Sequence, residues 1–113
     1  NKFLALQVKN DSSARACLRV LKKACDFENY DLIECGFGLN LLHQLDLSDQ
    51  LKALKCNTAF IHGSSDAVVN LQSVEYAAKI SNSSLSIILG AGHAPHVSQP
   101  NAVAGIIKNY LYQ

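Results

Sequence analysis

Two residues that could carry out proton transfer stand on short loops in the C-terminal half of the chain. Asp66 follows the loop residues 63–65, and His93 follows the glycine-rich residues 90–92. Glycine lets a backbone turn sharply enough to expose the side chain beside it. An imidazole that is hydrogen-bonded to a carboxylate through one nitrogen is fixed in orientation, and its other nitrogen can take a proton from a nucleophile. His93 is therefore a candidate general base, and Asp66 is a candidate carboxylate that orients it.

The segments around these loops predict how the pair would meet. Residues 58–62 and 85–89 are short, β-prone apolar runs, and helical spacing follows each of them, at residues 70–81 and 102–111. Strands that are joined by one crossover helix are parallel, and sites in such sheets lie at the carboxyl ends of the strands. We therefore expect an α/β fold with a βαβα unit in which the two loops lie side by side.

The N-terminal half is predicted to be helical. Polar residues 10–13 can cap a helix at residues 13–25, one face of which is basic. After a polar break at residues 26–29, we expect two helical segments, at 30–35 and 39–45, because glycines lie between them. No strand is expected before residue 56.

The chain is long enough for one compact domain with two parts. Residues 1–55 are expected to form a helical cap region and its return to the core. Residues 56–113 are expected to form the C-terminal βαβα part of the core, which carries Asp66 and His93.

The composition argues against several classes of partner and site. A net charge of +1 provides no global field to recruit nucleic acid or an anionic membrane. No apolar run approaches the roughly 18 residues of a membrane span. The four cysteines lack the close spacing of zinc and redox motifs, which favours reduced thiols in a cytoplasmic protein. We expect neither a cofactor nor a metal.

Simpler interpretations exist for several of these residues. His62 stands at a strand end and is interpreted as a packed or loop-bonding histidine. His96 offers an alternative in which it holds a metal with His93 and Asp66, since two histidines and a carboxylate are a known ligand set. From periodicity alone, the basic face of the helix at 13–25 is a solvated surface, and residues 3–7 are the packed end of a helix.

The C-terminal half resembles part of an α/β-hydrolase. The resemblance rests on HGSSDAVV at residues 62–69 and GAGHAPH at residues 90–96, followed by Pro100 and a terminal helix. In that superfamily the catalytic residues occur in the order nucleophile, acid, histidine. The resemblance implies that Asp66 is the acid and His93 the base of a Ser-His-Asp triad.

A finer similarity runs from residue 3 to the end of the chain. It rests on FLALQ, an arginine pair, GLNLL, LDLSDQLKAL and GHAPHVSQP. These segments resemble the esterases that hydrolyse pimeloyl-[acyl-carrier protein] methyl ester in biotin synthesis. The resemblance implies that Arg15 and Arg19 contact the acidic carrier protein. It also implies a substrate pocket lined by His93 and by Phe3, Leu4, Ala5, Leu6 and Gln7.

The nucleophile of such an enzyme is missing from these residues. The sequence contains no GxSxG elbow and no oxyanion-hole segment, and Ser64 and Ser65 stand in the acid loop. The chain also begins at Asn1 without an initiator methionine. We therefore expect a C-terminal fragment that is inactive alone, with the serine upstream. An uncovered sheet edge and apolar face would favour self-association of the fragment.

Two alternatives remain open. Another α/β-hydrolase, such as a general esterase, a lactonase or a carbon-carbon hydrolase, would share the triad and differ in its cap. A non-catalytic binding module on the same fold would keep the scaffold without the chemistry. A GxSxG motif after a strand upstream of Asn1 would favour catalysis.

Overall fold

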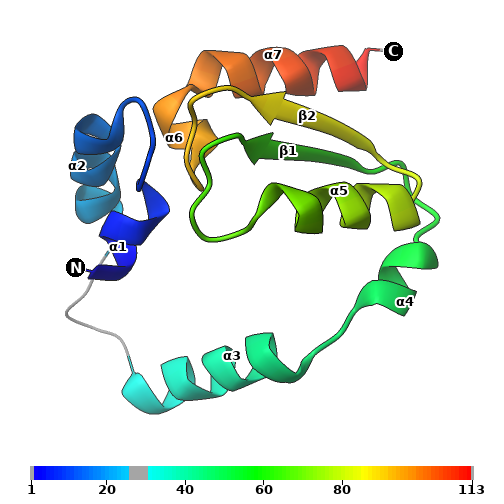
Figure 1. Ribbon diagram of the computed structural model, residues 1–113, viewed down its shortest axis with the longest axis horizontal. Helices are drawn as coiled ribbons and strands as arrows, with labels where there is room; N and C mark the ends of the chain where they lie inside the picture. The colour runs from blue at the N-terminus through cyan, green and yellow to red at the C-terminus, as the bar shows by residue number, and fades with distance from the viewer. Residues whose placement is uncertain (1, 26–30, 113) are drawn as a thin grey trace.

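The core of the fold is a pair of parallel strands (Figure 1), and the computed structural model describes residues 2–25 and 31–112. β1 (Ala59–Gly63) pairs with β2 (Ser84–Ile88) along the whole length of both strands. The chain passes from one to the other through α5 (Leu71–Ile80). The parallel strands predicted from the sequence are confirmed.

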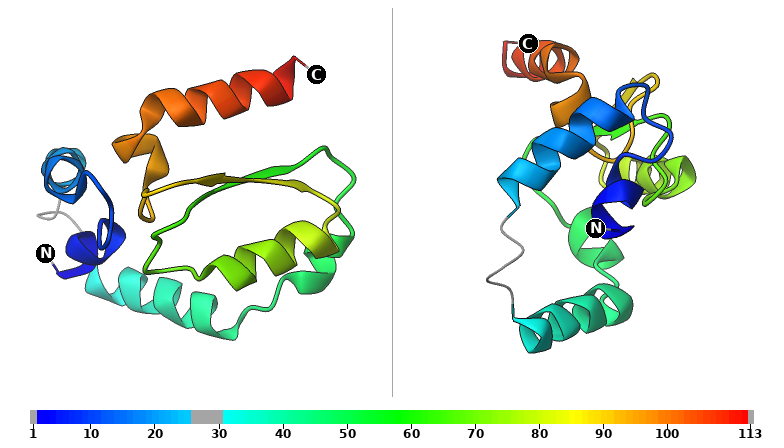
Figure 2. Two further views of the ribbon diagram at one scale, coloured as in Figure 1. Left: turned by 45° about the horizontal axis from the view of Figure 1, so that its top comes forward. Right: turned by 90° about the vertical axis from the view of Figure 1, so that its left-hand side faces the viewer.

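Helices cover both faces of the strand pair. α5 lies on one side and α7 (Pro100–Leu111) on the other, as Figures 1 and 2 show from different directions. Val74 and Ala78 of α5 and Ile88 of β2 are buried between these layers. The predicted βαβα order is thus confirmed, with element ends displaced by one or two residues.

The N-terminal helices lie at the end of the molecule where the strands run out into loops (Figure 1). α2 (Ala14–Ala24) contacts both α1 (Lys2–Gln7) and α6 (Pro95–Ser98). The helix predicted at residues 13–25 is confirmed. α1 and α6 are too short for a periodic pattern to indicate them. The N-terminal segment therefore packs beside the loop that carries His93.

The middle of the chain corrects one prediction. α3 (Leu32–Gln44) is a single helix that runs through Gly36 and Gly38, where an interruption was expected. A glycine costs only about 1 kcal/mol relative to alanine in a helix, which neighbouring residues can offset. Asp31 caps the start of α3, since its carboxylate accepts a hydrogen bond from the Ile33 amide at 2.7 Å. The expected break at 26–29 lies outside the described residues.

α3 contains no buried residue. After it, α4 (Ser48–Lys52) leads back toward the strands (Figure 2). The most exposed apolar side chains of α3 are Leu32, Ile33, Phe37, Leu39 and Leu42.

No helix within residues 2–25 and 31–112 combines the length and the apolar character that a membrane span requires.

Candidate active site

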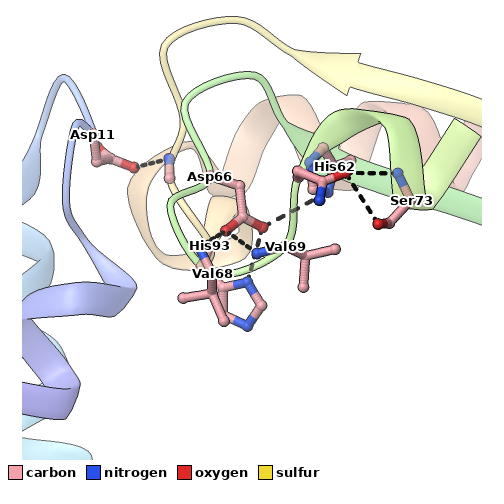
Figure 3. A network of polar contacts seen from close by, with 9 residues as sticks. Asp11, His62, Asp66, Val68, Val69, Ser73 and His93 are labelled. Carbon is pink, nitrogen blue, oxygen red and sulfur yellow. Dashed lines mark hydrogen bonds and ion pairs between the residues drawn. The ribbon is translucent and has the colours of Figure 1, made fainter.

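Asp66 and His93 meet at the carboxyl ends of β1 and β2 (Figure 3). His93 Nδ1 lies 2.8 Å from Asp66 Oδ2, so the contact expected from the strand order is present. The side chain of Asp66 is 3% exposed and that of His93 is 34% exposed. The imidazole is therefore anchored to a buried carboxylate while part of the ring remains accessible.

The environment of Asp66 keeps its carboxyl group ionised. Burial acts to raise its pKa, but the hydrogen bond to His93 and the backbone amides of Val69 and Val68 outweigh burial, and the pKa lies below its ordinary value of 3.8. The two amides donate to Asp66 Oδ1, at 2.7 Å from Val68 and 3.0 Å from Val69. A carboxylate held in this way fixes the tautomer of the imidazole and stabilises its protonated form.

A second histidine faces the same carboxylate. His62 is buried, and its Nδ1 lies 3.7 Å from Asp66 Oδ2, which is longer than a hydrogen bond. Figure 3 shows Asp66 between His62 and His93. This position agrees with the interpretation of His62 as a packed residue.

The metal alternative receives no support from the position of His96, which is exposed on α6. Across residues 2–25 and 31–112, no three His, Cys, Asp or Glu side chains are arranged as metal ligands.

The two loops that carry Asp66 and His93 are joined beyond the ends of the strands. The amide of Ser64 donates to the Ile88 carbonyl, and the amide of Ser65 donates to the Ala91 carbonyl, each at 2.9 Å. Ser64 Oγ accepts from the amide of Gly90, also at 2.9 Å. The side chain of Ser64 thus helps to join the two loops, a role that was not predicted from the sequence.

A third segment holds the histidine loop from the opposite side. The amide of His93 donates to the carbonyl of Gln7 at 3.0 Å. The amide of Gly92 donates to Asp11 Oδ2 at 2.6 Å. The sequence around Asp11 indicates only a helix-capping run, because nothing local marks a contact with residue 92.

The residues expected to line a substrate pocket form α1. Leu4 is 3% exposed, whereas Phe3 and Leu6 are 68% and 39% exposed. Ala5 is exposed and Gln7 is half-buried. α1 thus reaches the site through Gln7 and leaves two apolar side chains at the surface.

The basic residues expected to contact a carrier protein are exposed. Arg15 and Arg19 lie on α2, and Lys22 and Lys23 follow on its last turn.

The structure also contains a cavity near the opposite ends of the strands, away from Asp66 and His93. Its lining includes Thr58, Ser84 and Tyr110.

Comparisons with known proteins extend over nearly the whole chain. No protein-family model matches it. It is 34% identical to the biotin biosynthesis bifunctional protein BioHC of Teredinibacter turnerae, over 99% of this chain and 20% of that protein. It is 32% identical to the pimeloyl-[acyl-carrier protein] methyl ester esterase of Pseudoalteromonas atlantica, over 86% of this chain and 39% of that protein. The esterase of the same name from Aromatoleum aromaticum is 30% identical, over 97% of this chain and 45% of that protein.

A solved structure supports the same relationship. A thermophilic esterase from Thermogutta terrifontis, determined with malate bound, is similar with a TM-score of 0.60 and 32% identity, over 66% of this chain and 28% of that chain. The α/β-hydrolase fold expected from the sequence is confirmed, and so is the resemblance to the pimeloyl-[acyl-carrier protein] methyl ester esterases. The chain spans less than half the length of the three relatives named above.

Proposed function

We propose that this chain, which shares the α/β-hydrolase fold and resembles pimeloyl-[acyl-carrier protein] methyl ester esterases over nearly all of its length, is the C-terminal part of such an esterase. The complete enzyme hydrolyses the methyl ester to methanol and pimeloyl-[acyl-carrier protein] in the cytoplasm. The observation that carries this proposal is the 2.8 Å contact between His93 Nδ1 and the buried Asp66 carboxylate.

The proposed chemistry follows from that contact. A serine supplied by residues outside this chain attacks the ester carbonyl carbon while His93 Nε2 takes the hydroxyl proton. Asp66 stabilises the imidazolium that forms. The bond from the carbonyl carbon to the methoxy oxygen then breaks, and His93 protonates the leaving oxygen to give methanol.

Water completes the cycle. It attacks the acyl-serine carbonyl carbon as His93 takes one of its protons, and the bond to serine breaks as His93 returns that proton. The products are the free carboxylic acid and the regenerated serine. No step requires a metal or a redox group.

The proposed substrate contacts come from the N-terminal helices. Phe3, Leu4, Ala5, Leu6 and Gln7 line the acyl pocket, which is consistent with the exposed side chains of Phe3 and Leu6. Arg15 and Arg19 bind the acidic carrier protein, which is consistent with their exposure on α2. Such surface charges act on the encounter with the partner more than on the chemistry.

The first experiment measures hydrolysis of purified pimeloyl-[acyl-carrier protein] methyl ester by the complete enzyme. We expect turnover that is lost in His93→Ala. Turnover of a small p-nitrophenyl ester without any turnover of the carrier ester would instead support a general esterase, the alternative favoured by the similarity to the Thermogutta terrifontis enzyme.

The second experiment tests the carrier contact by reversing charge in Arg15→Glu/Arg19→Glu. We expect KM for the carrier-bound ester to rise roughly tenfold, a change of about 1.4 kcal/mol, and much less change for a small ester. Lys79→Glu/Lys108→Glu is the matched control, because both lysines are exposed on other helices. An equal loss on both esters, or an equal effect of the control, contradicts the proposed contact.

A further inference from the structure

The loop that carries His93 is held on two sides. On one side it is joined to the loop of Asp66. On the other, three hydrogen bonds connect it to the end of α1 and the segment that follows: His93 amide to Gln7 carbonyl at 3.0 Å, Gly92 amide to Asp11 Oδ2 at 2.6 Å, and Ser12 amide to Gly90 carbonyl at 2.9 Å. Among these acceptors, only Asp11 contributes a side chain.

Asp11 is a buried charged residue in the connection between α1 and α2. It is 8% exposed, and its Oδ1 accepts a second hydrogen bond, from the Ser13 amide at 2.7 Å. Burial acts to raise the pKa of Asp11, but the amides of Gly92 and Ser13 outweigh it and lower the pKa, so the carboxyl group is ionised at neutral pH. A buried charge is costly unless it is well hydrogen-bonded. One of its two amide donors belongs to the residue immediately before His93.

A purely local turn would not need this arrangement. Asp46 provides the comparison, since its Oδ1 accepts from the Ser48 amide at 2.9 Å in the same two-residue pattern while its side chain stays exposed. Asp11 adds burial and a partner 81 residues away. The approach is close, because a Cβ on Gly92 would lie 3.2 Å from both Asp11 Cβ and the Gln7 carbonyl oxygen.

We propose that Asp11 is a positioning residue for His93, holding the backbone of the histidine loop while Asp66 holds the imidazole ring. The proposal rests on the proposed function, in which His93 is the general base. Displacing a catalytic group by about 1 Å can cost roughly a hundredfold in rate. Without Asp11 the ring keeps its carboxylate partner, but the backbone beside it loses the one side-chain hydrogen bond that ties it to the N-terminal segment.

The same contacts couple the base to the proposed acyl pocket. Gln7 is the last residue of α1, and its carbonyl accepts from the amide of His93. A backbone hydrogen bond therefore joins His93 directly to the helix that forms the wall of the proposed pocket. A substrate seated against α1 is in this way placed relative to His93.

The test compares Asp11→Ala, Asp11→Asn and Asp46→Ala in the complete enzyme, with a p-nitrophenyl ester as substrate. For Asp11→Ala we expect kcat to fall about 10- to 100-fold with little change in KM. Asp11→Asn keeps an acceptor oxygen for the Gly92 amide, so we expect it to recover most of that loss. Asp46→Ala, which removes only a local turn contact, should match the wild type.

A second readout follows the His93 site directly by proton NMR. The proton between His93 Nδ1 and Asp66 should give a far-downfield resonance that broadens or shifts in Asp11→Ala and stays unchanged in Asp46→Ala. If Asp11→Ala does not fold, Asp11→Asn carries the test through a smaller shift of the same resonance. A wild-type kcat together with an unchanged resonance in the Asp11 variants would overturn the proposal.

These readouts separate the two proposals. An enzyme that cleaves the small ester but not the carrier ester refutes the proposed substrate and leaves the kinetic test of Asp11 in place. An enzyme that cleaves neither ester refutes the proposed function, and the resonance of His93 still decides whether Asp11 positions the loop.

Discussion

Two buried aspartates serve the histidine loop from opposite sides and in different ways. Asp66, on the loop after β1, bonds to the imidazole ring of His93 at 2.8 Å. Asp11, between α1 and α2, bonds to the backbone amide of Gly92 at 2.6 Å. Both carboxylates also accept hydrogen bonds from other backbone amides, and the pKa of each lies below its ordinary value. Asp66 sets the orientation of the imidazole ring, and Asp11 helps to set the position of the loop backbone.

The comparison shows that orientation and position are supplied by different parts of the chain. Orientation comes from within the βαβα unit, since the strands and their loops are close in sequence. The position of the loop depends in addition on the helical N-terminal segment, which contacts it from outside that unit. A change on one side should therefore affect the site differently from a change on the other.

The largest effect is expected on the ring side. Asp66→Ala in the complete enzyme should lower kcat by roughly 10³- to 10⁴-fold, because the imidazole loses its tautomer and its charge partner. Steady-state kinetics with the p-nitrophenyl ester measure the loss, and circular dichroism shows whether the fold is retained. A folded Asp66→Ala enzyme within tenfold of the wild type would remove Asp66 from the proposed triad.

A backbone test distinguishes the two sides at the level of stability. Gly63→Ala should lower the free energy of unfolding by roughly 1–3 kcal/mol, because its Cβ would collide with the carbonyl oxygens of Ala91 and Gly92. Gly92→Ala should cost less, since its Cβ would lie 3.2 Å from both Asp11 Cβ and the Gln7 carbonyl oxygen, which requires these neighbours to shift by only a few tenths of an ångström.

Urea denaturation of the complete enzyme measures both changes. Gly105→Ala is the control, because Gly105 lies in α7 with no atom within 4 Å of an added Cβ, and it should be neutral or slightly stabilising. Equal losses for Gly63→Ala and Gly105→Ala would contradict the close loop contact.

The smallest expected effect is the dependence of stability on pH. The pKa values of Asp11 and Asp66 are lowered in the folded state, so the unfolded chain binds protons more readily than the folded one below their ordinary value of 3.8. Their contribution to stability is thus complete above that pH and is lost as the pH falls through the lowered values. Urea midpoints at pH 7 and pH 3 should show a smaller drop for Asp11→Asn than for the wild type; an equal drop would contradict the ionised Asp11.

The contact between Asp66 and the His93 ring could be predicted from the sequence, and the contact between Asp11 and the Gly92 amide could not. Two short apolar runs joined by one helix place their loops at the same edge of a parallel sheet, so Asp66 and His93 could be paired from spacing alone. Asp11 stands in a run of small polar residues that is typical of a helix cap, and its distant partner is a backbone amide, which has no sequence signature. For α3, the two glycines wrongly indicated an interruption.

The hydrogen bond from Gly92 to Asp11 also bears on the order in which the chain folds. It closes a loop of 81 residues, whereas the contact of His93 with Asp66 closes one of 27. The longer closure costs about 1 kcal/mol more in chain entropy, and distant contacts tend to form slowly. We expect the ring pair to assemble early and the loop to dock onto the N-terminal segment late. In pulsed hydrogen exchange during refolding, the Gly92 amide should then gain protection after the amides of β2.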